Sequence, residues 1–486
     1  MSFRRILVLL VLVAGLGGYL YLYEVPQAER EGKKAKLLGV EKDAVTQLAL
    51  VYPDRELELR KDDKGWRLVK PADAPADEAV VNGLIAVLTD AEVQKTVEPL
   101  PAKLADFGLD KPTVTARLTL KDGTQTPPIV VGKNTAIGGK AYVRKDDEPK
   151  LYLTASTIGF GLSKQPKDVR DKTILSFLDD DVSRIEIRAE NGDTVALVRK
   201  DKDAWTVEPG DHPADPTEVR SYLSSLRSAR AVDFPDDNPQ DLGKYGLGVP
   251  RLTVVVVTGK EGNARQVLLV GAETTQGSQK QIYAKRGDQP TIYALGDYAF
   301  GSLAKPPSQF RDKTVLAFDP TRVGKVAFER KDGARLTFVR GEGKWTLEGN
   351  EEKVKESAIA TLLDDLRDLR GADIAAEPAR NLTTWGLDQP DVRFVLTDKE
   401  GQPIGSVLAA KHDGKSYVMR AESETVFEAR DYMYARLDKQ RKDFIEEPGA
   451  PAAGNSTTTI APAGAANPGA GADEPDEGDE PEDGED

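Results

Sequence analysis

The stretch GWRLV, residues 65–69, decides the fold of this chain, because the chain repeats its pattern twice more. AWTVE at residues 204–208 and KWTLE at residues 344–348 place the three tryptophans 139 and 140 positions apart. Similarity that recurs at a fixed period indicates an internal repeat, and it has to be recognised before any other feature. The chain is therefore expected to contain three copies of one structural unit.

A second landmark follows each tryptophan segment in the same order. It is an aromatic-Gly-Leu turn with a proline four residues after the glycine, at residues 107–109, 245–247 and 385–387. An alternating strand, a Val-Gly strand end and a tyrosine-containing strand come next in each copy. For the Val-Gly pair, the third copy offers only Leu408-Ala409. The shared order makes duplication the economical explanation.

The three repeat modules are predicted at residues 40–175, 176–316 and 317–447. Each is long enough to bury its own core, whereas repeats of roughly 20 to 50 residues depend on their neighbours for burial. Within a copy, three strands precede a helix and several more strands follow it. This pattern predicts an α+β fold class: three tandem homologous modules, each a mostly antiparallel sheet with one main amphipathic helix.

The helix of each module is predicted from an apolar stripe at helical spacing. The stripe residues are Val80, Leu84 and Leu88, then Val219, Leu223 and Leu226, then Ile359, Leu363 and Leu366. In the second copy, Asp215 is the expected N-cap, Pro216 the first-turn proline and Glu218 the capping-box acid. One face of such a helix packs against a sheet and the other stays in water.

The N-terminus carries a membrane-targeting segment. An uncharged apolar run at residues 6–23 follows a cytoplasmic N-terminus at residues 1–5, and a linker at residues 24–39 leads to the first module. The run is long enough to approach a bilayer core of roughly 30 Å. It lacks a small-residue cleavage site, which favours an uncleaved transmembrane helix over a removed signal peptide. The modules are then expected outside the cytoplasm.

The remaining composition excludes several classes of function. Cysteine is absent, which removes disulfides, thiolate nucleophiles and zinc-thiolate sites. Residues 448–486 form a predicted disordered tail rich in Pro, Ala, Gly and acid. Its last stretch, from Asp473 onward, holds ten acidic residues, so it accounts for ten of the net charge of -14 and leaves about -4 elsewhere. This charge and the lack of a binding motif argue against nucleic-acid binding.

No catalytic, cofactor-binding or metal site is predicted. The two histidines, His212 and His412, each have an adjacent aspartate but no second histidine nearby, and a zinc site needs three or four ligands. Carboxylates are abundant, but the sequence singles out no pair for acid–base chemistry. The repeated tryptophans are interpreted as core residues rather than as a ligand groove. The protein is therefore predicted not to be an enzyme.

The candidate site is the joint where one module passes into the next. Its residues are Arg170, Asp171, Lys172, Arg311, Asp312 and Lys313. Two interpretations remain open. The charges either fix the angle between neighbouring modules, or they are a solvated linker with exposed ion pairs that contribute roughly 0 to 1 kcal/mol each. The third copy ends in a degenerate stretch at residues 436–444, where no further module follows.

These features together resemble the DUF4340 family, a bacterial family of domains of unknown function. The resemblance covers roughly residues 40–447 and rests on the anchor, the aromatic-Gly-Leu turn, the Val-Gly strand end, the tyrosine strand and the Arg-Asp-Lys joint. Members look like membrane-anchored extracytoplasmic proteins, often encoded beside ABC transporter components of the gliding-motility type. The resemblance implies an accessory role and supplies no catalytic residues.

The predicted function is a non-enzymatic scaffold or accessory subunit of an ABC-transporter-like complex. It is placed in the bacterial inner membrane as a single-pass protein, with the membrane and transporter subunits as partners. The alternative is a binding module for cell-wall polymer or polysaccharide, with one subsite per copy giving avidity. A hydrolase with a single site remains a third class, and it requires residues present in one copy and absent from the others.

Overall fold

The computed structural model describes residues 35–259 and 264–446. The chain divides into two compact units, with the boundary between Lys313 and Thr314. Module 1 and residues 176–313 of module 2 lie in the first unit, and module 3 lies in the second. The predicted span at residues 6–23 and the tail at 448–486 lie outside the described residues. Within the described part, no helix is long and apolar enough to cross a membrane.

Module 1 is built on one sheet of nine strands. The strands are β1 (Val45–Val51), β2 (Glu56–Asp62), β3 (Gly65–Lys70), β4 (Ala74–Pro75), β5 (Lys95–Val97), β6 (Val114–Leu120), β7 (Ile129–Asn134), β8 (Lys140–Lys145) and β9 (Leu151–Ala155). The helices are η2 (Lys42–Ala44), α3 (Glu78–Thr89), η3 (Leu104–Phe107), α4 (Thr157–Leu162) and α5 (Pro166–Val169).

Module 2 repeats this arrangement with another nine-stranded sheet. The strands are β10 (Val182–Ala189), β11 (Thr194–Arg199), β12 (Trp205–Glu208), β13 (His212–Pro213), β14 (Asp233–Asp236), β15 (Leu252–Thr258), β16 (Ala264–Gln276), β17 (Gln279–Arg286) and β18 (Ile292–Gly296). The helices are η4 (Asp179–Asp181), α6 (Pro216–Ser228), η5 (Gly243–Tyr245), α7 (Tyr298–Leu303) and α8 (Pro307–Phe310).

Module 3 has a sheet of eight strands. The strands are β19 (Val323–Arg330), β20 (Arg335–Gly341), β21 (Lys344–Leu347), β22 (Asp373–Ala376), β23 (Val392–Asp398), β24 (Pro403–His412), β25 (Lys415–Arg420) and β26 (Val426–Ala429). The helices are η6 (Pro320–Arg322), α9 (Glu356–Arg367), η7 (Leu382–Trp385), α10 (Asp431–Leu437) and α11 (Arg441–Phe444).

Each sheet joins two antiparallel halves at its centre. In module 1 the strand order is β4-β3-β2-β1-β6-β7-β8-β9-β5, and every neighbouring pair is antiparallel. The first half therefore runs outward from β1 and the second half outward from β6. Module 2 follows the same order, and module 3 lacks only the counterpart of β4. The predicted class, antiparallel-sheet modules with few helices, is confirmed.

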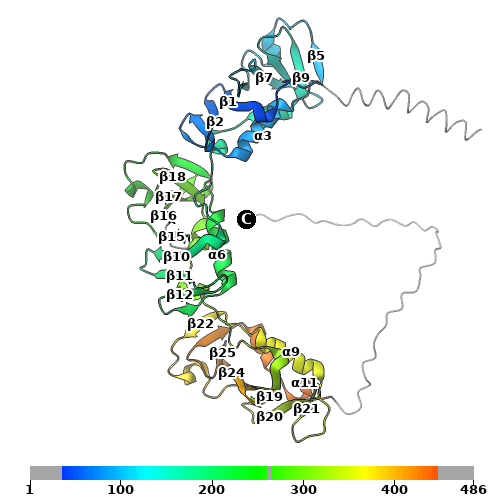
Figure 1. Cartoon of the computed structure of the whole chain (residues 1–486), viewed down its shortest axis with the longest axis vertical. Coiled ribbons are helices and arrows are strands. Elements are labelled where there is room, and N and C mark those ends of the chain that lie inside the picture. Colours follow the sequence, from blue (N-terminus) through cyan, green and yellow to red (C-terminus); the bar gives the residue numbers. More distant parts are fainter. Residues whose placement is uncertain (1–34, 260–263, 447–486) are drawn as a thin grey trace, which may run out of the picture. The chain divides into compact units, whose positions relative to one another are not determined.

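One main helix covers a face of each sheet, as Figure 1 shows for α6 beside β10, β11 and β12. The predicted apolar stripe of α6 is buried, because Val219, Leu223 and Leu226 are at most 3 % exposed. The carboxylate of Asp215 caps the helix by accepting hydrogen bonds from the backbone N–H groups of Thr217 (2.8 Å) and Glu218 (3.4 Å). The prediction of an N-cap is confirmed.

The predicted capping box in α6 is wrong. In a capping box the acid, Glu218, would accept the backbone N–H of Asp215, but this N–H donates to the carbonyl of Phe310 at 2.8 Å. Instead, the Glu218 carboxylate accepts a hydrogen bond from Nζ of Lys305 at 3.3 Å and forms an ion pair with it. Lys305 follows α7, so this ion pair ties the start of α6 to the last part of module 2. The Glu218 side chain, which the local sequence predicted to cap the helix terminus, instead pairs with Lys305, a residue distant in the sequence.

The repeated tryptophans lie in the main cores, between sheet and helix. Trp66 is 4 % exposed, Trp205 6 % and Trp345 7 %, and each belongs to the main apolar cluster of its own module. Burial of a large apolar side chain contributes roughly 1.5–3 kcal/mol. The interpretation of these residues as core is confirmed, and none of their rings is available as a ligand platform.

A second, smaller core lies on the other face of each sheet. In β7, Val131 belongs to the main cluster and its neighbour Val130 to the small one, because successive strand residues point to opposite faces. The aromatic-Gly-Leu turn covers this second face. Gly108 has φ +67°, which favours glycine, and the ring of Phe107 meets the ring of Tyr142 edge-on at 4.9 Å.

The Val-Gly strand end exists because the turn approaches it closely. A Cβ on Gly132 would lie 2.2 Å from the carbonyl oxygen of Phe107. In module 3, the register pairs Val392 with Ala409, as it pairs Val114 with Val131 in module 1. The equivalent pair in module 3 is therefore Ala409-Ala410, and the sequence-based match to Leu408-Ala409 was wrong by one residue.

Candidate functional site at the joint between modules 1 and 2

The segment that leaves module 1 is first held by module 1 itself. The backbone N–H of Asp77 donates to the carbonyl of Val169 at 2.8 Å, and the N–H of Asp171 donates to the carbonyl of Pro75 at 2.9 Å. Arg170 lies between these two bonds and forms an antiparallel bridge with Ala76. The joint therefore begins as an extra strand residue beside β4, rather than as a free linker.

The same segment is then held by module 2. The N–H of Ala231 donates to the carbonyl of Lys172 at 2.9 Å, and Thr173 bridges Arg230. The carboxylate of Asp171 accepts the N–H of Thr173 at 2.9 Å, which fixes the turn between the two sets of bonds. Backbone bonds on both sides of Asp171 thus span the passage from one module to the next.

Arg170 is the central side chain of this joint. It is 7 % exposed, and its Nη1 and Nη2 atoms donate to the two carboxylate oxygens of Asp237 in module 2 at 2.9 and 2.6 Å. Its guanidinium carbon lies 3.9 Å from the ring centroid of Phe234, also in module 2. A two-point guanidinium–carboxylate pair over an aromatic ring fixes direction as well as distance.

Two further ion pairs flank the joint. Nζ of Lys167 lies 3.3 Å from a carboxylate oxygen of Asp233, and Nη2 of Arg230 lies 3.5 Å from a carboxylate oxygen of Asp77. The side chains of Lys167 and Arg230 are 43 % and 51 % exposed. Exposed pairs of this kind contribute about 0 to 1 kcal/mol. The Arg170 contact is therefore the one that distinguishes the joint from a solvated linker.

The second predicted set lies at the exit of module 2. Arg311 forms a bridge with Ala214, and the N–H of Asp312 donates to the carbonyl of Pro213 at 2.9 Å. This repeats the backbone pattern of Arg170 and Asp171. Lys313 is partly exposed and ends the first compact unit. The structure thus places the six predicted residues in two separate sites, each at the end of its own module.

Module 3 keeps the backbone pattern but has no arginine in it. The N–H of Lys355 donates to the carbonyl of Phe444 at 2.8 Å, and the N–H of Glu446 donates to the carbonyl of Lys353 at 2.9 Å. Ile445, which is 7 % exposed, stands between them in the position of Arg170. An apolar residue occupies the closing position in module 3, so a module can make these backbone bonds without an arginine there.

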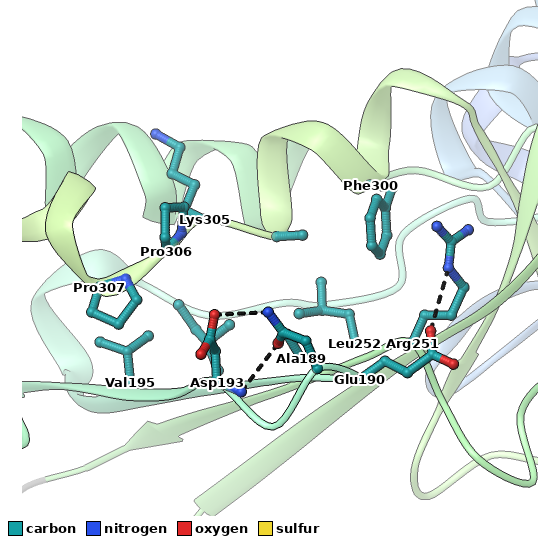
Figure 2. A pocket seen from close by; sticks show the side chains of 13 residues that line it. Ala189, Glu190, Asp193, Val195, Arg251, Leu252, Phe300, Lys305, Pro306 and Pro307 are labelled. Atoms are coloured by element: carbon teal, nitrogen blue, oxygen red, sulfur yellow. Dashed lines mark hydrogen bonds and ion pairs between the residues drawn. The ribbon is translucent and has the colours of Figure 1, made fainter.

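Sequence reasoning missed a pocket in module 2, drawn in Figure 2. It has a volume of about 350 Å³ and lies between the β10–β11 hairpin and the segment around α7 and α8. Buried Ile187, Val195 and Leu252 line it, together with Phe300. The guanidinium of Arg251 lies 4.4 Å from the centroid of the Phe300 ring. Apolar walls with a few polar groups are typical of a ligand pocket.

The other modules fill the equivalent position with a side chain of their own. Tyr52 occupies it in module 1, where its hydroxyl donates to the carbonyl of Leu162 at 2.5 Å and accepts the N–H of Lys164 at 3.3 Å. Burial raises the pKa of Tyr52. Arg330 occupies it in module 3, and Ala189 in module 2. This substitution of a large residue by alanine was the signal in the sequence that could have found the pocket.

The histidines do not contribute to either site. His212 pairs with Val207 at the edge of the sheet in module 2, and His412 ends β24 in module 3. Nε2 of His412 lies 3.6 Å from a carboxylate oxygen of Asp413. Across residues 35–259 and 264–446, no group of three or more His, Cys, Asp or Glu side chains could hold a metal ion.

Tandem antiparallel sheets, each with one main helix and a closing strand residue, define a repeat protein whose modules share one plan. The model of the family described as "Domain of unknown function (DUF4340)" matches residues 66–210, 205–390 and 348–456. These matches cover well over half of the chain, and the chain belongs to the DUF4340 family. The resemblance inferred from the repeated motifs is confirmed.

Comparisons with other proteins add little. No curated protein matches the chain. Among solved structures, the DNA polymerase sliding clamp from Pseudomonas aeruginosa with ligand is 10 % identical, with 82 % of this chain and 93 % of that one covered and a TM-score of 0.13. A putative DNA polymerase III beta subunit from Eubacterium rectale is 9 % identical over the same shares, also with a TM-score of 0.13. TM-scores this low do not indicate a shared fold.

Proposed function

We propose that this protein is a non-enzymatic, membrane-anchored scaffold or accessory subunit of an ABC-transporter-like complex in the bacterial envelope. Membership of the DUF4340 family and the predicted span at residues 6–23 support this proposal. Its mechanism is positioning. The anchor holds one end of the chain at the membrane, and the modules present surfaces at a defined spacing from it. The joint between modules 1 and 2 has to keep its angle for this role.

The observation that carries the proposal is the position of Arg170. A module needs no arginine there for its own closure, because Ile445 closes module 3. Arg170 instead reaches Asp237 and Phe234 in the following module. Burying a guanidinium is costly unless its partners are well placed, so the contact persists only in a narrow range of module orientations. A joint built in this way suits a spacer with a fixed geometry.

The angle at this joint can be measured by pulsed electron–electron double resonance, which reports the distance between two spin labels. The chain has no cysteine, so spin labels on introduced cysteines at Asp63 in module 1 and Lys202 in module 2 report only the intended distance. We expect a narrow distance distribution in the otherwise unchanged chain and a broad one after Arg170→Ala. Lys167→Ala is the matched control, because it removes an exposed ion pair at the same joint. Equal widths in all three proteins would contradict a fixed joint.

Location and partner are tested by crosslinking in intact cells, followed by detergent extraction and mass spectrometry. The full chain is compared with a variant that lacks residues 6–23. We expect transporter subunits to be recovered with the full chain and not with the shortened one. Recovery of wall polymer by both forms would instead favour the polymer-binding alternative. Recovery of neither partner would contradict the accessory role.

A further inference from the structure

A guanidinium donates to the same backbone carbonyl in modules 1 and 3. In module 1, Nε of Arg55 donates to the carbonyl of Lys164 at 3.0 Å. In module 3, Nη1 of Arg330 donates to the carbonyl of Lys439, the equivalent lysine, at 2.7 Å. Nη1 of Arg330 also donates to a carboxylate oxygen of Asp438 at 2.6 Å. Both modules thus supply their own arginine to this position, from the first hairpin of the sheet.

Module 2 lacks an arginine at both hairpin positions. Equivalent hairpin residues are identified by the backbone hydrogen bond that closes each hairpin. The N–H of Tyr52 donates to the carbonyl of Arg55 at 2.8 Å, and the N–H of Ala189 donates to the carbonyl of Asp193 at 2.9 Å. Asp193 therefore replaces Arg55. Ala189 likewise replaces Arg330, whose N–H closes the third hairpin. A cation has been exchanged for an anion, and a long side chain for a methyl group.

The acceptor carbonyl remains in module 2. The N–H of Lys305 donates to the carbonyl of Leu303 at 3.1 Å, and the N–H of Lys439 donates to the carbonyl of Leu437 at 2.7 Å, so the chain follows the same path in modules 2 and 3. Among the residues that the structure describes, no side chain donates to the carbonyl of Lys305. The position that receives a guanidinium in the other two modules is open toward the pocket.

The pocket is suited to an arginine side chain that comes from another molecule. Ile187, Val195 and Leu252 form apolar walls for the aliphatic stem. Figure 2 shows the carboxylate of Asp193 on the hairpin side, with Pro307 on the opposite wall. Asn191 donates to the Asp193 carboxylate at 2.8 Å, and within the described residues this carboxylate forms no ion pair. A guanidinium can donate to a carboxylate and a carbonyl at once because its N–H groups form a planar fork.

The cations already at the pocket do not occupy this position. Nζ of Lys305 pairs with Glu218 at 3.3 Å, and Nη1 of Arg251 pairs with Glu273 at 2.8 Å. Glu190, 3.9 Å from Nε of Arg251, adds a further carboxylate to the rim. The lining therefore has no spare positive charge and presents acidic groups to an incoming ligand. This favours a cationic ligand over an anionic one.

We infer that the module 2 pocket binds an arginine side chain presented by a partner protein, which takes the place of the arginine that modules 1 and 3 supply themselves. The partner is a protein with an exposed arginine on a protruding segment. The binding site consists of Asp193, the carbonyl of Lys305 and the apolar walls around Val195. This inference depends on module 2 alone and holds whether or not the chain serves as a scaffold.

The test is methyl NMR on the full chain in detergent, titrated with Nα-acetyl-argininamide. We expect saturable shifts of the methyl groups of Ile187, Val195 and Leu252. Val114, which lines the smaller module 1 pocket beside Tyr52, provides the internal control and is expected not to shift. Nα-acetyl-citrullinamide has nearly the same shape but no charge, and it is expected to bind roughly tenfold more weakly.

Two variants separate specific binding from surface attraction. Asp193→Asn keeps an acceptor for Asn191 but removes the charge, and we expect it to weaken binding roughly tenfold. Ala189→Tyr introduces the residue that fills this position in module 1, and we expect it to abolish the shifts. Equal affinity for the citrulline analogue, or unchanged affinity in Asp193→Asn, would overturn the inference. The two variants alter different features of the pocket, its charge and its free volume. If one of them misfolds, the other still tests the inference.

Discussion

The guanidinium of Arg170 in module 1 and the carboxylate of Asp237 in module 2 form a two-point ion pair across the joint, at 2.6 and 2.9 Å. The arginine is buried and the side chain of the aspartate is 42 % exposed. Because only one partner is shielded from water, most of the cost of breaking the pair arises from leaving the guanidinium without its acceptor. The first prediction follows from this asymmetry.

Asp237→Ala is expected to loosen the joint without unfolding either module. The buried Arg170 loses both acceptor oxygens, at a cost of about 1–3 kcal/mol. The N–H of Ala231, which donates to the carbonyl of Lys172 across the joint, is then expected to exchange with deuterium faster. Hydrogen-exchange mass spectrometry of the peptide around Ala231 checks this. Lys167→Ala is the control and is expected to leave the exchange at Ala231 unchanged. If Asp237→Ala also leaves it unchanged, the Arg170–Asp237 ion pair does not hold the joint.

The buried hydroxyl of Tyr222 predicts alkaline sensitivity. Tyr222 is fully buried in the core of module 2, and its hydroxyl donates to the carbonyl of Leu303 at 2.9 Å. Burial raises the pKa of Tyr222 above its ordinary value of 10.0. The folded protein therefore keeps the proton when the unfolded chain loses it. Stability is unaffected below about pH 10 and falls above it, by up to about 1.4 kcal/mol per pH unit.

Tyr222→Phe is expected to remove this part of the alkaline loss. At neutral pH the variant loses one hydrogen bond and about 1 kcal/mol. Urea unfolding at several values between pH 7 and pH 11.5 checks both effects, since the difference between the two proteins should shrink as the pH rises. Tyr298→Phe is the control, because the Tyr298 side chain is exposed. A constant difference across the whole range would refute the assignment.

Two glycines of module 1 are expected to respond to alanine with opposite signs. A Cβ on Gly132 would lie 2.2 Å from the carbonyl oxygen of Phe107, so Gly132→Ala has to displace the turn at a cost of about 1–3 kcal/mol. A Cβ on Gly83, within α3, meets nothing within 4 Å. Gly83→Ala should stabilise module 1 by about 0.5–1 kcal/mol. Thermal unfolding of the two variants is the measurement, and shifts of the same sign would contradict the prediction.

Tyr52→Phe is expected to destabilise module 1 by about 1 kcal/mol. The hydroxyl of Tyr52 connects the carbonyl of Leu162 with the N–H of Lys164, and phenylalanine leaves both without this partner. The guanidinium of Arg55, 4.0 Å from the ring centroid, keeps its contact in the variant. Urea unfolding compared with Tyr142→Phe isolates the effect of the hydroxyl. Equal losses in the two variants would show that the hydroxyl of Tyr52 has no special role.

The repeated pattern was sufficient to predict the modules, because the signals involved are local. Val219, Leu223 and Leu226 define one helix face by their spacing alone, and that face is buried as expected. The same holds for Trp66, whose place beside Leu68 in a short strand indicated the core. The strand order could not be predicted, because no local pattern in β1 indicates that it pairs with β6. Leu48 of β1 pairs with Leu118 of β6, 70 positions further along the chain.

The two candidate sites show the same limit in different ways. Arg170 was identified as a joint residue, but its partner is one of several aspartates in the stretch that begins at Asp233, and only the fold selects Asp237. The pocket was missed altogether. Its signal is the replacement of Tyr52 and Arg330 by Ala189, which acquires meaning only when the three hairpins are known to be equivalent.

The sequence by itself determined that this protein contains three copies of one α+β module, because period, alternation and helical spacing are properties of neighbouring residues. Only the tertiary structure decided which charges meet at the joint and which position in module 2 is left empty. Both depend on distances between residues far apart in the chain. Such distances are set by the packing of sheets and helices, and no local pattern of residue types records them.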